Sequence, residues 1–461
     1  MVSDRHRNRI LLILFIGVLM GALDIAILAP ALPAVQQSFG IDERSLAWIF
    51  SIYVLCNVVG TPLMAKLSDV RGRRPIYILD VTLFALGSLI VALSALPLSF
   101  PLLLLGRAIQ GFGAGGIFPV ASAVIGDTFP PEKRGSALGL IGAVFGLAFV
   151  VGPILGAIIL AVASWPWLFV INLPIAAAII VQARRWLPAP QLRPPQPFDL
   201  AGMATLALGL ASLTYGVSQI ETAHFFRSLG ATAVWPFLAA ALVLLALFWQ
   251  IEQRAPDPIL RVRLFASRQI RVLAGLAAGA GVGEATLVFV PSLLVVAFGV
   301  SESVASRMLL PAVLAMMVGA PLAGRLLDRI GSRRVVTMGS LALAAGMLLV
   351  GRLSLTLLIF YACAGLIGLG MGMLLGAPLR YIMLNEAPPA DRGAGQAALV
   401  LFTSTGRLLG SAGVGAIAAS LGGGLAGFQR AYFMVGWLAI LLALLALNLK
   451  TRAQEKATAR G

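Results

Sequence analysis

The sequence predicts an all-α protein that crosses a membrane many times. Hydrophobic residues make up 59% of its 461 residues, and charged residues only 11%. An ordinary soluble domain is about 25% charged, and the mean hydropathy of this chain is +0.97. So few charges could not cover the surface of a soluble protein of this length, which excludes a soluble enzyme. The abundance of large apolar residues excludes a disordered chain.

Apolar stretches long enough to cross a bilayer recur along the whole chain. A spanning helix needs about 20 mostly apolar residues. Fourteen spans meet this condition: 10–34, 46–67, 76–96, 100–126, 136–162, 166–185, 200–220, 232–250, 271–298, 304–327, 335–353, 356–384, 395–420 and 430–449. Because the number is even, both termini are expected on the same side.

The basic residues predict which side that is. If the N-terminus is cytoplasmic, 24 of the 34 Lys and Arg fall in cytoplasmic segments and five in outer ones. Cytoplasmic loops collect Lys and Arg, so both termini are expected in the cytoplasm. The net charge of +16 then follows from topology, and no nucleic-acid partner is expected. The two cysteines and two histidines lie apart in the sequence, so no metal site is expected.

The two ends of the chain contain an internal repeat. The segment AKLSDVRGRRP (65–75) matches GRLLDRIGSRRV (324–335), which aligns Asp69 with Asp328 and Gly72 with Gly331. Two spans between the repeats have no counterpart, so the arrangement is six plus two plus six, and parallel halves of this kind are typical of transporters. The predicted parts are an N-terminal six-helix bundle (1–186), a cytoplasmic linker (187–199), an inserted helix pair (200–250), a second cytoplasmic linker (251–269), a C-terminal six-helix bundle (270–450) and a cytoplasmic tail (451–461).

Three motifs connect the chain to a known family. The loop after the second span fits the pattern Gly-x-Leu-x-Asp-x-x-Gly-x-[Arg/Lys]-[Arg/Lys], with Ala65 in place of the first Gly. The fourth span contains LLLLGRAIQGFGAGG (102–116), and the fifth contains GLIGAVFGLAFVVGPILGA (139–157). In these motifs the chain resembles major facilitator superfamily transporters, above all the fourteen-helix drug–proton antiporters, over nearly its whole length. The resemblance implies the major facilitator fold.

The repeated loops are expected to act as a conformational latch, as the resemblance implies. A short helix–helix turn needs Gly for backbone freedom, and an Asp there can pair with Arg and release it again. The residues of the expected latch are Asp69, Gly72, Arg73, Arg74, Asp328, Arg329, Gly331, Arg333 and Arg334. The alternative is an ordinary cytoplasmic loop rich in basic residues.

The motifs in the fourth and fifth spans imply coupling and antiport. Arg107 lies deep in a span, where a charge is costly unless it faces protein or water, and Gln110 follows it on the same helix face. Proton coupling is the functional interpretation, and a structural hydrogen bond to a neighbouring helix is the alternative. The antiporter motif of the fifth span consists of Gly139, Gly152, Pro153 and Gly156. Generic Gly-rich packing is the alternative there.

Two acids in the spans give the strongest indication of function. Asp24 follows Ile10 by fourteen residues, about 21 Å of helix rise, and lies near the middle of the bilayer. Glu284 lies in the middle of its span at a near-equivalent repeat position. Burial favours the neutral form of an unpaired carboxyl, and a nearby Arg favours the charged form. A carboxyl that exchanges partners can thus take up and release a proton; a permanent ion pair with Arg107 is the alternative for Asp24.

Three further charged residues lie within spans, and only Arg407 among them lies deep. Arg407 is expected to pair with Glu284 or to gate the cavity. Asp80 and Arg380 lie near cytoplasmic ends of spans, and their charged groups are expected to reach the membrane surface.

The sequence therefore predicts a proton-coupled efflux transporter of the bacterial plasma membrane, an antiporter for drugs or other amphipathic small molecules. It is expected to work by alternating access, as a monomer that is not an enzyme. No cofactor is expected, because the proton gradient is expected to drive transport. The alternatives are a lipid or glycolipid exporter on the same fold, an uptake symporter, and a sensor or scaffold that transports nothing.

Overall fold

The computed structural model describes residues 4–129, 131–188, 199–221, 224–256, 258–354, 356–388 and 392–458, and these residues form helices and turns without a strand. By internal contacts, the chain divides into two compact units. The first comprises Met1–Ile41, Trp48–Phe198 and Glu302–Arg307, and the second comprises Asp42–Ala47, Asp199–Ser301 and Met308–Gly461. Most of the predicted linker 187–199 lies outside the described residues.

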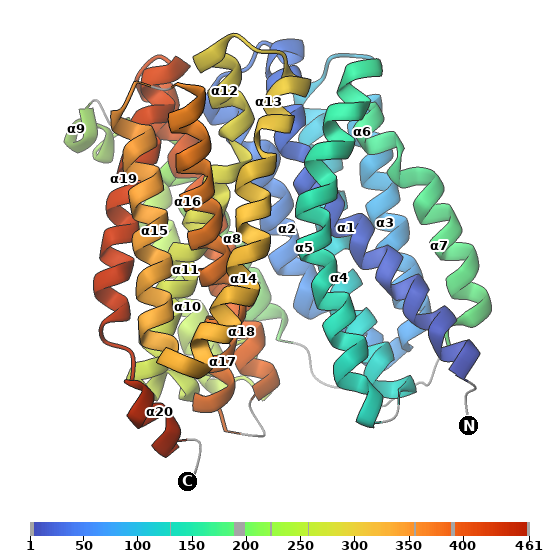
Figure 1. The fold of residues 1–461 in the computed structure, drawn as a ribbon. Helices are drawn as coiled ribbons and strands as arrows, with labels where there is room; N and C mark the ends of the chain where they lie inside the picture. The colour runs from blue at the N-terminus through green and yellow to red at the C-terminus, as the bar shows by residue number, and fades with distance from the viewer. Residues whose placement is uncertain are drawn as a thin grey trace. The chain divides into compact units, whose positions relative to one another are not determined.

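Most of the helices are long, and a few short ones lie between them or follow them (Figure 1). Before residue 199 they are α1 (Asp4–Phe39), α2 (Glu43–Arg71), α3 (Arg73–Leu93), α4 (Phe100–Thr128), α5 (Pro131–Val162), α6 (Trp167–Val170) and α7 (Asn172–Trp186). After it come α8 (Leu200–Ser218), α9 (Phe225–Leu229), α10 (Trp235–Arg254), η2 (Val262–Ala266), α11 (Arg268–Val288), α12 (Val290–Phe298), α13 (Glu302–Met308), α14 (Leu310–Ile330), α15 (Ser332–Arg352), α16 (Leu357–Leu375), α17 (Ala377–Glu386), α18 (Arg392–Ser420), α19 (Gly424–Ala446) and α20 (Arg452–Thr458).

Thirteen stretches of the described chain are long and apolar enough to cross a bilayer. The remaining predicted span, 136–162, falls on α5, where the described residues give only the shorter apolar stretch Val151–Val162. The predicted all-helical membrane protein is therefore confirmed. The count of fourteen and the arrangement of six plus two plus six stay predictions.

Four spans that we predicted as continuous helices are each divided in two. The span 166–185 breaks between α6 and α7, and the span 304–327 breaks between α13 and α14. The span 271–298 breaks between α11 and α12, and Pro291 lies in the first turn of α12. The span 356–384 breaks at Gly376, and Pro378 lies in the first turn of α17. Proline has no N–H to donate to the carbonyl four residues earlier, and its ring clashes there, so a new helix begins instead.

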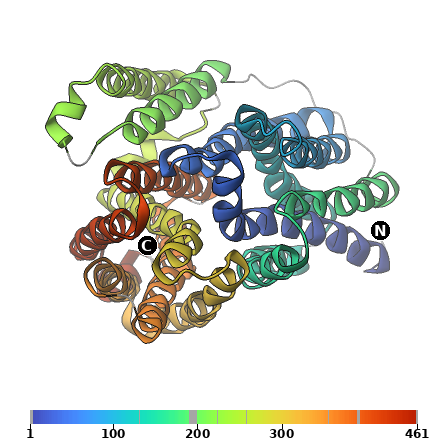
Figure 2. The same cartoon turned by 90° about the horizontal axis from the view of Figure 1, so that it is seen from above.

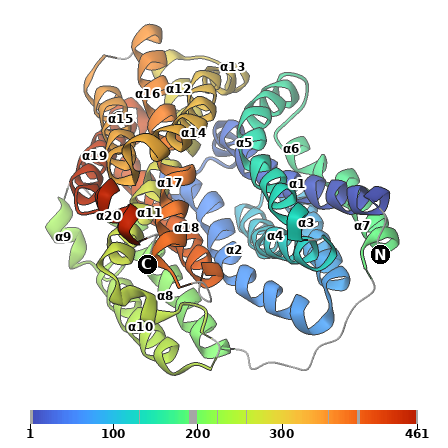
Figure 3. The same cartoon turned by 60° about the horizontal axis from the view of Figure 1, so that its bottom comes forward.

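The same helix pairings occur in both units. In the first, α3 packs on α4, α1 on α5 and α3 on α7; in the second, α15 packs on α16, α11 on α18 and α15 on α19. Figure 3 shows α3 beside α4, and α8 beside α10. The pair α8 and α10, green in the view from above (Figure 2), packs on α18 within the second unit.

A single glycine joins the helices of each repeated loop. Gly72 connects α2 to α3 with φ +94° and ψ 152°, and Gly331 connects α14 to α15 with φ +84° and ψ 163°. This region of backbone conformation is open essentially only to glycine. The sequence alignment of Gly72 with Gly331 thus has a backbone cause, because both turns reverse the chain in one residue.

We expect Gly72→Ala to destabilise the protein by about 1–3 kcal/mol, because a Cβ strains the backbone at this positive φ. The measurement is the thermal unfolding of the protein in detergent micelles. Gly126→Ala is the matched control, since Gly126 lies in α4 with open space where its Cβ would be. Equal unfolding temperatures for the two variants would contradict the argument.

Candidate functional site: two buried ion pairs

Asp24 and Arg107 form an ion pair inside the first unit. The Arg107 Nη1 lies 2.6 Å from Asp24 Oδ2, and both side chains are fully buried. The Arg107 Nε donates to the carbonyl of Ile49 at 3.2 Å. The guanidinium lies over the ring of Tyr53, 4.2 Å from its centroid, which adds a cation–π contact in a desolvated place. Residues of α1 and α2 thus contact the Arg107 guanidinium of α4.

Three neutral side chains complete this network. Gln110 Oε1 accepts from Arg107 at 2.6 Å, and Gln110 Nε2 donates to Asp24 Oδ1 and to Ser88 Oγ, each at 2.7 Å. Asn172 Nδ2 donates to the same two oxygens at 3.2 Å. Asn172 is the first residue of α7, just after the break from α6. The network therefore involves α3 and α7 as well.

The network is arranged for a carboxylate at position 24. Every neighbour that hydrogen-bonds to Asp24 donates to it: Arg107 to Oδ2, and Gln110 and Asn172 to Oδ1. An ionised carboxyl is an acceptor only, so it satisfies all three donors, whereas a protonated carboxyl carries a donor of its own. A carboxylate at position 24 thus accepts from the Arg107 guanidinium at one oxygen and from two amide groups at the other.

Glycines bring the helices of this site close together. A Cβ on Gly111 would lie 2.2 Å from the Tyr53 carbonyl oxygen, and one on Gly87 would lie 2.4 Å from the Gln110 nitrogen. Because these positions are glycine, α4 touches the backbones of α2 and α3, as small residues allow in membrane helices. This close approach holds Arg107 within reach of Ile49 and Tyr53.

The second unit contains a corresponding pair that is less enclosed. Arg407 Nε, from α18, lies 2.8 Å from Glu284 Oε2, from α11, with side chains 29% and 9% exposed. The two helices approach closely beside it, because a Cβ on Gly281 would lie 2.0 Å from the Thr403 carbonyl oxygen. The acids occupy near-equivalent repeat positions, but their Arg partners come from the fourth helix of one repeat and the fifth of the other.

The first repeated loop carries an ion-pair cluster centred on Arg73. Its Nη1 lies 2.5 Å from Asp69 Oδ1 and donates to Ser68 Oγ at 2.7 Å, while its Nε lies 3.0 Å from Asp127 Oδ2. Asp127 is in the last turn of α4. Arg74 donates to the Arg184 carbonyl at 3.5 Å. The cluster ties the ends of α2, α3 and α4 together.

The second repeated loop is bound by the C-terminal helix α20 instead. Glu455 accepts hydrogen bonds from the amide and the hydroxyl of Ser332, the first residue of α15. Arg452 donates to the Arg329 carbonyl. Arg333 and Arg334 lie in the first turn of α15. The side chain of Asp328 lies outside the described residues, so its predicted contact is not tested.

A family model described as "Major Facilitator Superfamily" matches residues 14–283 and 272–461, most of the chain. The chain belongs to the major facilitator superfamily. Among its relatives, "Uncharacterized MFS-type transporter YfiU" of Bacillus subtilis is 35% identical over 86% of this chain and 76% of that protein. "Multidrug resistance protein 3" of the same organism is 31% identical over 86% and 77%. The predicted family is confirmed, and the chain is a multi-pass membrane transporter.

Other members of the superfamily are similar in sequence or in fold. "Triacylglyceride transporter" of Mycolicibacterium smegmatis is 31% identical over 90% of this chain and 76% of that protein. The solved structure of a D-xylose–proton symporter is 15% identical, with a TM-score of 0.72 over 98% of this chain and 99% of that one. At that identity, the likeness establishes the major facilitator fold alone.

Gly152, from the motif that we predicted to mark an antiporter, packs against the helix that carries Asp24. A Cβ on Gly152 would lie 2.5 Å from the Cβ of Ala26, two residues after Asp24. Pro153 lies inside α5, and Gly156 is buried. The surroundings of Gly139 lie outside the described residues.

One placement that we predicted is wrong. Asp80 does not reach the membrane surface, because it is fully buried in α3 and its two carboxyl oxygens have no hydrogen-bond partner among the described residues. Its carboxyl fills the space beside Gly116, where a Cβ would lie 2.2 Å from Oδ2. A glycine on the facing helix thus lets the acid remain inside. Arg380 is exposed, and its reach to the membrane surface stays a prediction.

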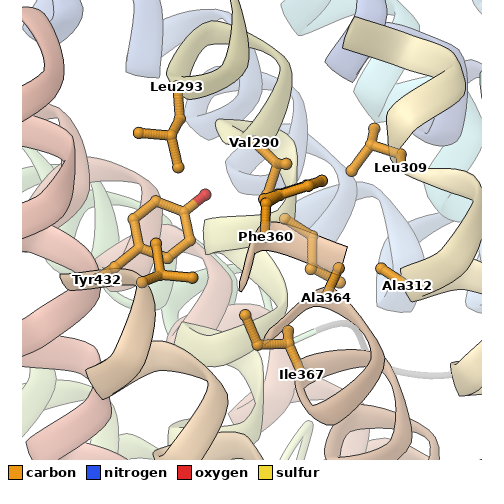
Figure 4. Close-up of a pocket in the computed structure, with 10 residues that line it drawn as sticks. Val290, Leu293, Leu309, Ala312, Phe360, Ala364, Ile367 and Tyr432 are labelled. Atoms are coloured by element: carbon orange, nitrogen blue, oxygen red, sulfur yellow. The ribbon is translucent and has the colours of Figure 1, made fainter. Parts of the chain in front are cut away.

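Sequence reasoning missed an apolar cavity in the second unit. Leu287, Val290, Leu293, Leu309, Ala312, Val350, Phe360, Ala364, Ile367 and Tyr432 line it. Figure 4 shows Tyr432 and Phe360 facing the same space as Val290 and Leu309. The Tyr432 hydroxyl donates to the Thr286 carbonyl at 2.8 Å. The cavity lies at the break between α11 and α12, and it has room for no more than a single water-sized group.

Proposed function

We propose that this transporter exports amphipathic small molecules by alternating access and is driven by protons that bind to and leave Asp24. The observation that carries the proposal is the buried network in which Asp24 pairs with Arg107 and accepts hydrogen bonds only. A charged residue inside a membrane span marks a proton or substrate pathway by default.

The network supplies a physical link between protonation and conformation. When Asp24 takes up a proton, Arg107 loses its counter-charge while it stays buried. An unpaired buried charge is costly, so the protonated unit favours another conformation in which the guanidinium meets water or substrate. Loss of the proton restores the pair and the closed network. Each cycle then exchanges one proton at Asp24 for movement of substrate.

Glu284 and Arg407 are proposed to contribute a second charge-dependent contact. Arg407 is partly exposed, so an anion or a substrate dipole can reach its guanidinium and compete with Glu284 for it. The latch loops are proposed to hold alternate conformations through Arg73 and its partners Asp69 and Asp127. Both termini are proposed to face the cytoplasm of a bacterial cell.

The test is transport by the purified protein in lipid vesicles with an imposed pH gradient. We expect the wild-type protein to accumulate the fluorescent amphipathic cation ethidium only when the gradient is present. Asp24→Asn cannot take up the proton and should lose accumulation, while it still lets ethidium move down its own gradient. Glu221→Gln, which removes an exposed acid, is the control. Gradient-driven accumulation at the wild-type rate by Asp24→Asn would overturn the coupling.

Export of a lipid is the second candidate. The relative named for triacylglyceride transport is compatible with such a substrate. Vesicles that contain a fluorescent triacylglyceride distinguish the candidates: gradient-dependent transfer of the lipid, with no accumulation of ethidium, would select lipid export.

A further inference from the structure

Two acids lie together at one end of the inserted helices α8 and α10. Asp199 caps the N-terminus of α8, where its Oδ1 accepts from the Gly202 amide at 2.7 Å. Glu252 lies in the last turn of α10 and is 3% exposed. Its Oε2 accepts from the amide of Leu260 at 2.8 Å. Each carboxyl thus has one oxygen occupied by a backbone N–H.

The other two oxygens face each other. Asp199 Oδ2 and Glu252 Oε1 are buried, and no hydrogen-bond donor among the described residues reaches either of them. Both lie beside Gly202, where a Cβ would be 2.2 Å from Asp199 Oδ2 and 2.8 Å from Glu252 Oε1. Both oxygens therefore lie against the same point of α8, close to each other. A glycine is needed at this position for the acids to meet.

We propose that Asp199 and Glu252 form a proton-binding site in which the two carboxyls share one proton. Ionised carboxylates are acceptors only, so two of them cannot hydrogen-bond. Two carboxylates that share a buried site repel each other, and one therefore holds a proton. With that proton, the O–H of one acid donates to the other, and all four carboxyl oxygens are used.

The surroundings favour a proton over a metal ion. Calcium takes six to eight oxygen ligands, and magnesium also requires six, but only two side-chain oxygens face this site. The described residues contain no group of three or more His, Cys, Asp and Glu that could hold a metal ion.

No basic group described on the neighbouring elements donates a hydrogen bond to the two facing oxygens in place of the proton. On α10, Arg254 follows Glu252 by two residues and is exposed. Arg261 and Arg263 lie at the segment after Leu260, and Arg407 of α18 pairs with Glu284. None of these residues donates to the two facing oxygens. Among the described residues, no other donor reaches Asp199 Oδ2 or Glu252 Oε1.

The shared proton joins three parts of the chain. It connects the start of α8 to the end of α10, and through Glu252 to Leu260, eight residues before α11 begins. When the proton leaves, the two negative charges repel each other, and the contact opens. The closed contact thus exists at lower pH and is lost as the pH rises.

The site is tested by infrared spectroscopy of the purified protein in lipid vesicles, as the difference between spectra taken at lower and at higher pH. We expect the wild-type protein to have one protonated-carboxyl C=O band that is absent from Glu252→Gln and from Asp199→Asn. Asp199→Asn keeps the cap through its side-chain oxygen, so it serves if Glu252→Gln does not fold. Glu221→Gln is the matched control and should keep the band. If both site variants have the same protonated-carboxyl bands as the wild-type protein, the two acids do not share a proton.

Amide hydrogen exchange tests the consequence for the chain. Peptides that cover residues 258–268 should lose protection in the wild-type protein as the pH rises, after correction for the intrinsic exchange rate. Glu252→Gln should keep its protection, because an amide donates to Asp199 and accepts from Leu260 at every pH. If the wild-type protein and Glu252→Gln exchange alike at high pH, the proton does not hold this contact. Neither experiment requires transport, so a failure here is distinguishable from a failure of the proposed function.

Discussion

Replacing Arg107 with Met is expected to destabilise the protein by about 3–5 kcal/mol, since removing one partner of a buried ion pair leaves the other charge without compensation. Methionine keeps much of the length and apolar volume of the Arg side chain but cannot pair with Asp24. Its neighbours Gln110 and Ile49 also lose their hydrogen bonds from the guanidinium. The measurement is thermal unfolding of the protein in detergent micelles.

The double variant Arg107→Met with Asp24→Asn separates the charge effect from packing. Because no unpaired charge is left, we expect it to recover much of the lost stability, as replacement of whole buried ion pairs often does. It should remain inactive in gradient-driven transport. If the double variant unfolds at the same temperature as Arg107→Met alone, the loss arises from packing and not from the buried charge of Asp24.

Gly406→Ala is expected to separate α11 from α18 and to destabilise the second unit by about 1–3 kcal/mol, the usual cost of overpacking. A Cβ at this position would lie 1.9 Å from the Ala278 carbonyl oxygen, which is backbone and cannot move aside like a side chain. The next residue is Arg407, so the 2.8 Å contact with Glu284 should lengthen as well. Thermal unfolding and the transport rate measure the two effects.

Gly413→Ala is the matched control for this prediction. Gly413 lies on the same helix, and nothing is within 4 Å of the position that its Cβ would take. The substitution also raises helix propensity by about 1 kcal/mol, so its unfolding temperature should be unchanged or slightly higher. If Gly406→Ala is tolerated equally well, the close approach of α11 and α18 does not support the ion pair.

The sequence could predict the features that depend on local composition. Spans of apolar residues have to cross the bilayer, and few charges remain to be placed. Asp24 and Glu284 were therefore recognisable as deep acids, and the repeat of Gly72 at Gly331 identified two turns that adopt the same positive φ. These predictions needed only spacing and the cost of charge in lipid.

Features that depend on tertiary contacts could not be predicted in the same way. Ser88 is one of many hydroxyls in apolar spans, and only the packing of α3 on α4 brings it to Gln110. Asp80 was placed by its distance from the helix end, but the gap beside Gly116 decides its position. The breaks before Pro291 and Pro378 were missed because proline also occurs within unbroken helices here, as Pro119 does in α4.

The helix α3 connects the first repeated loop to the buried network of Asp24 and Arg107. It carries Arg73 at its start and Ser88 fifteen residues later, a separation of about 22 Å at the rise of an α-helix. Because Gly72 is the whole connection to α2, the turn has no slack in which to absorb a displacement. If α3 moves as a unit, a displacement of Arg73 also displaces Ser88, whose hydroxyl accepts from Gln110 beside the buried pair of Asp24 and Arg107.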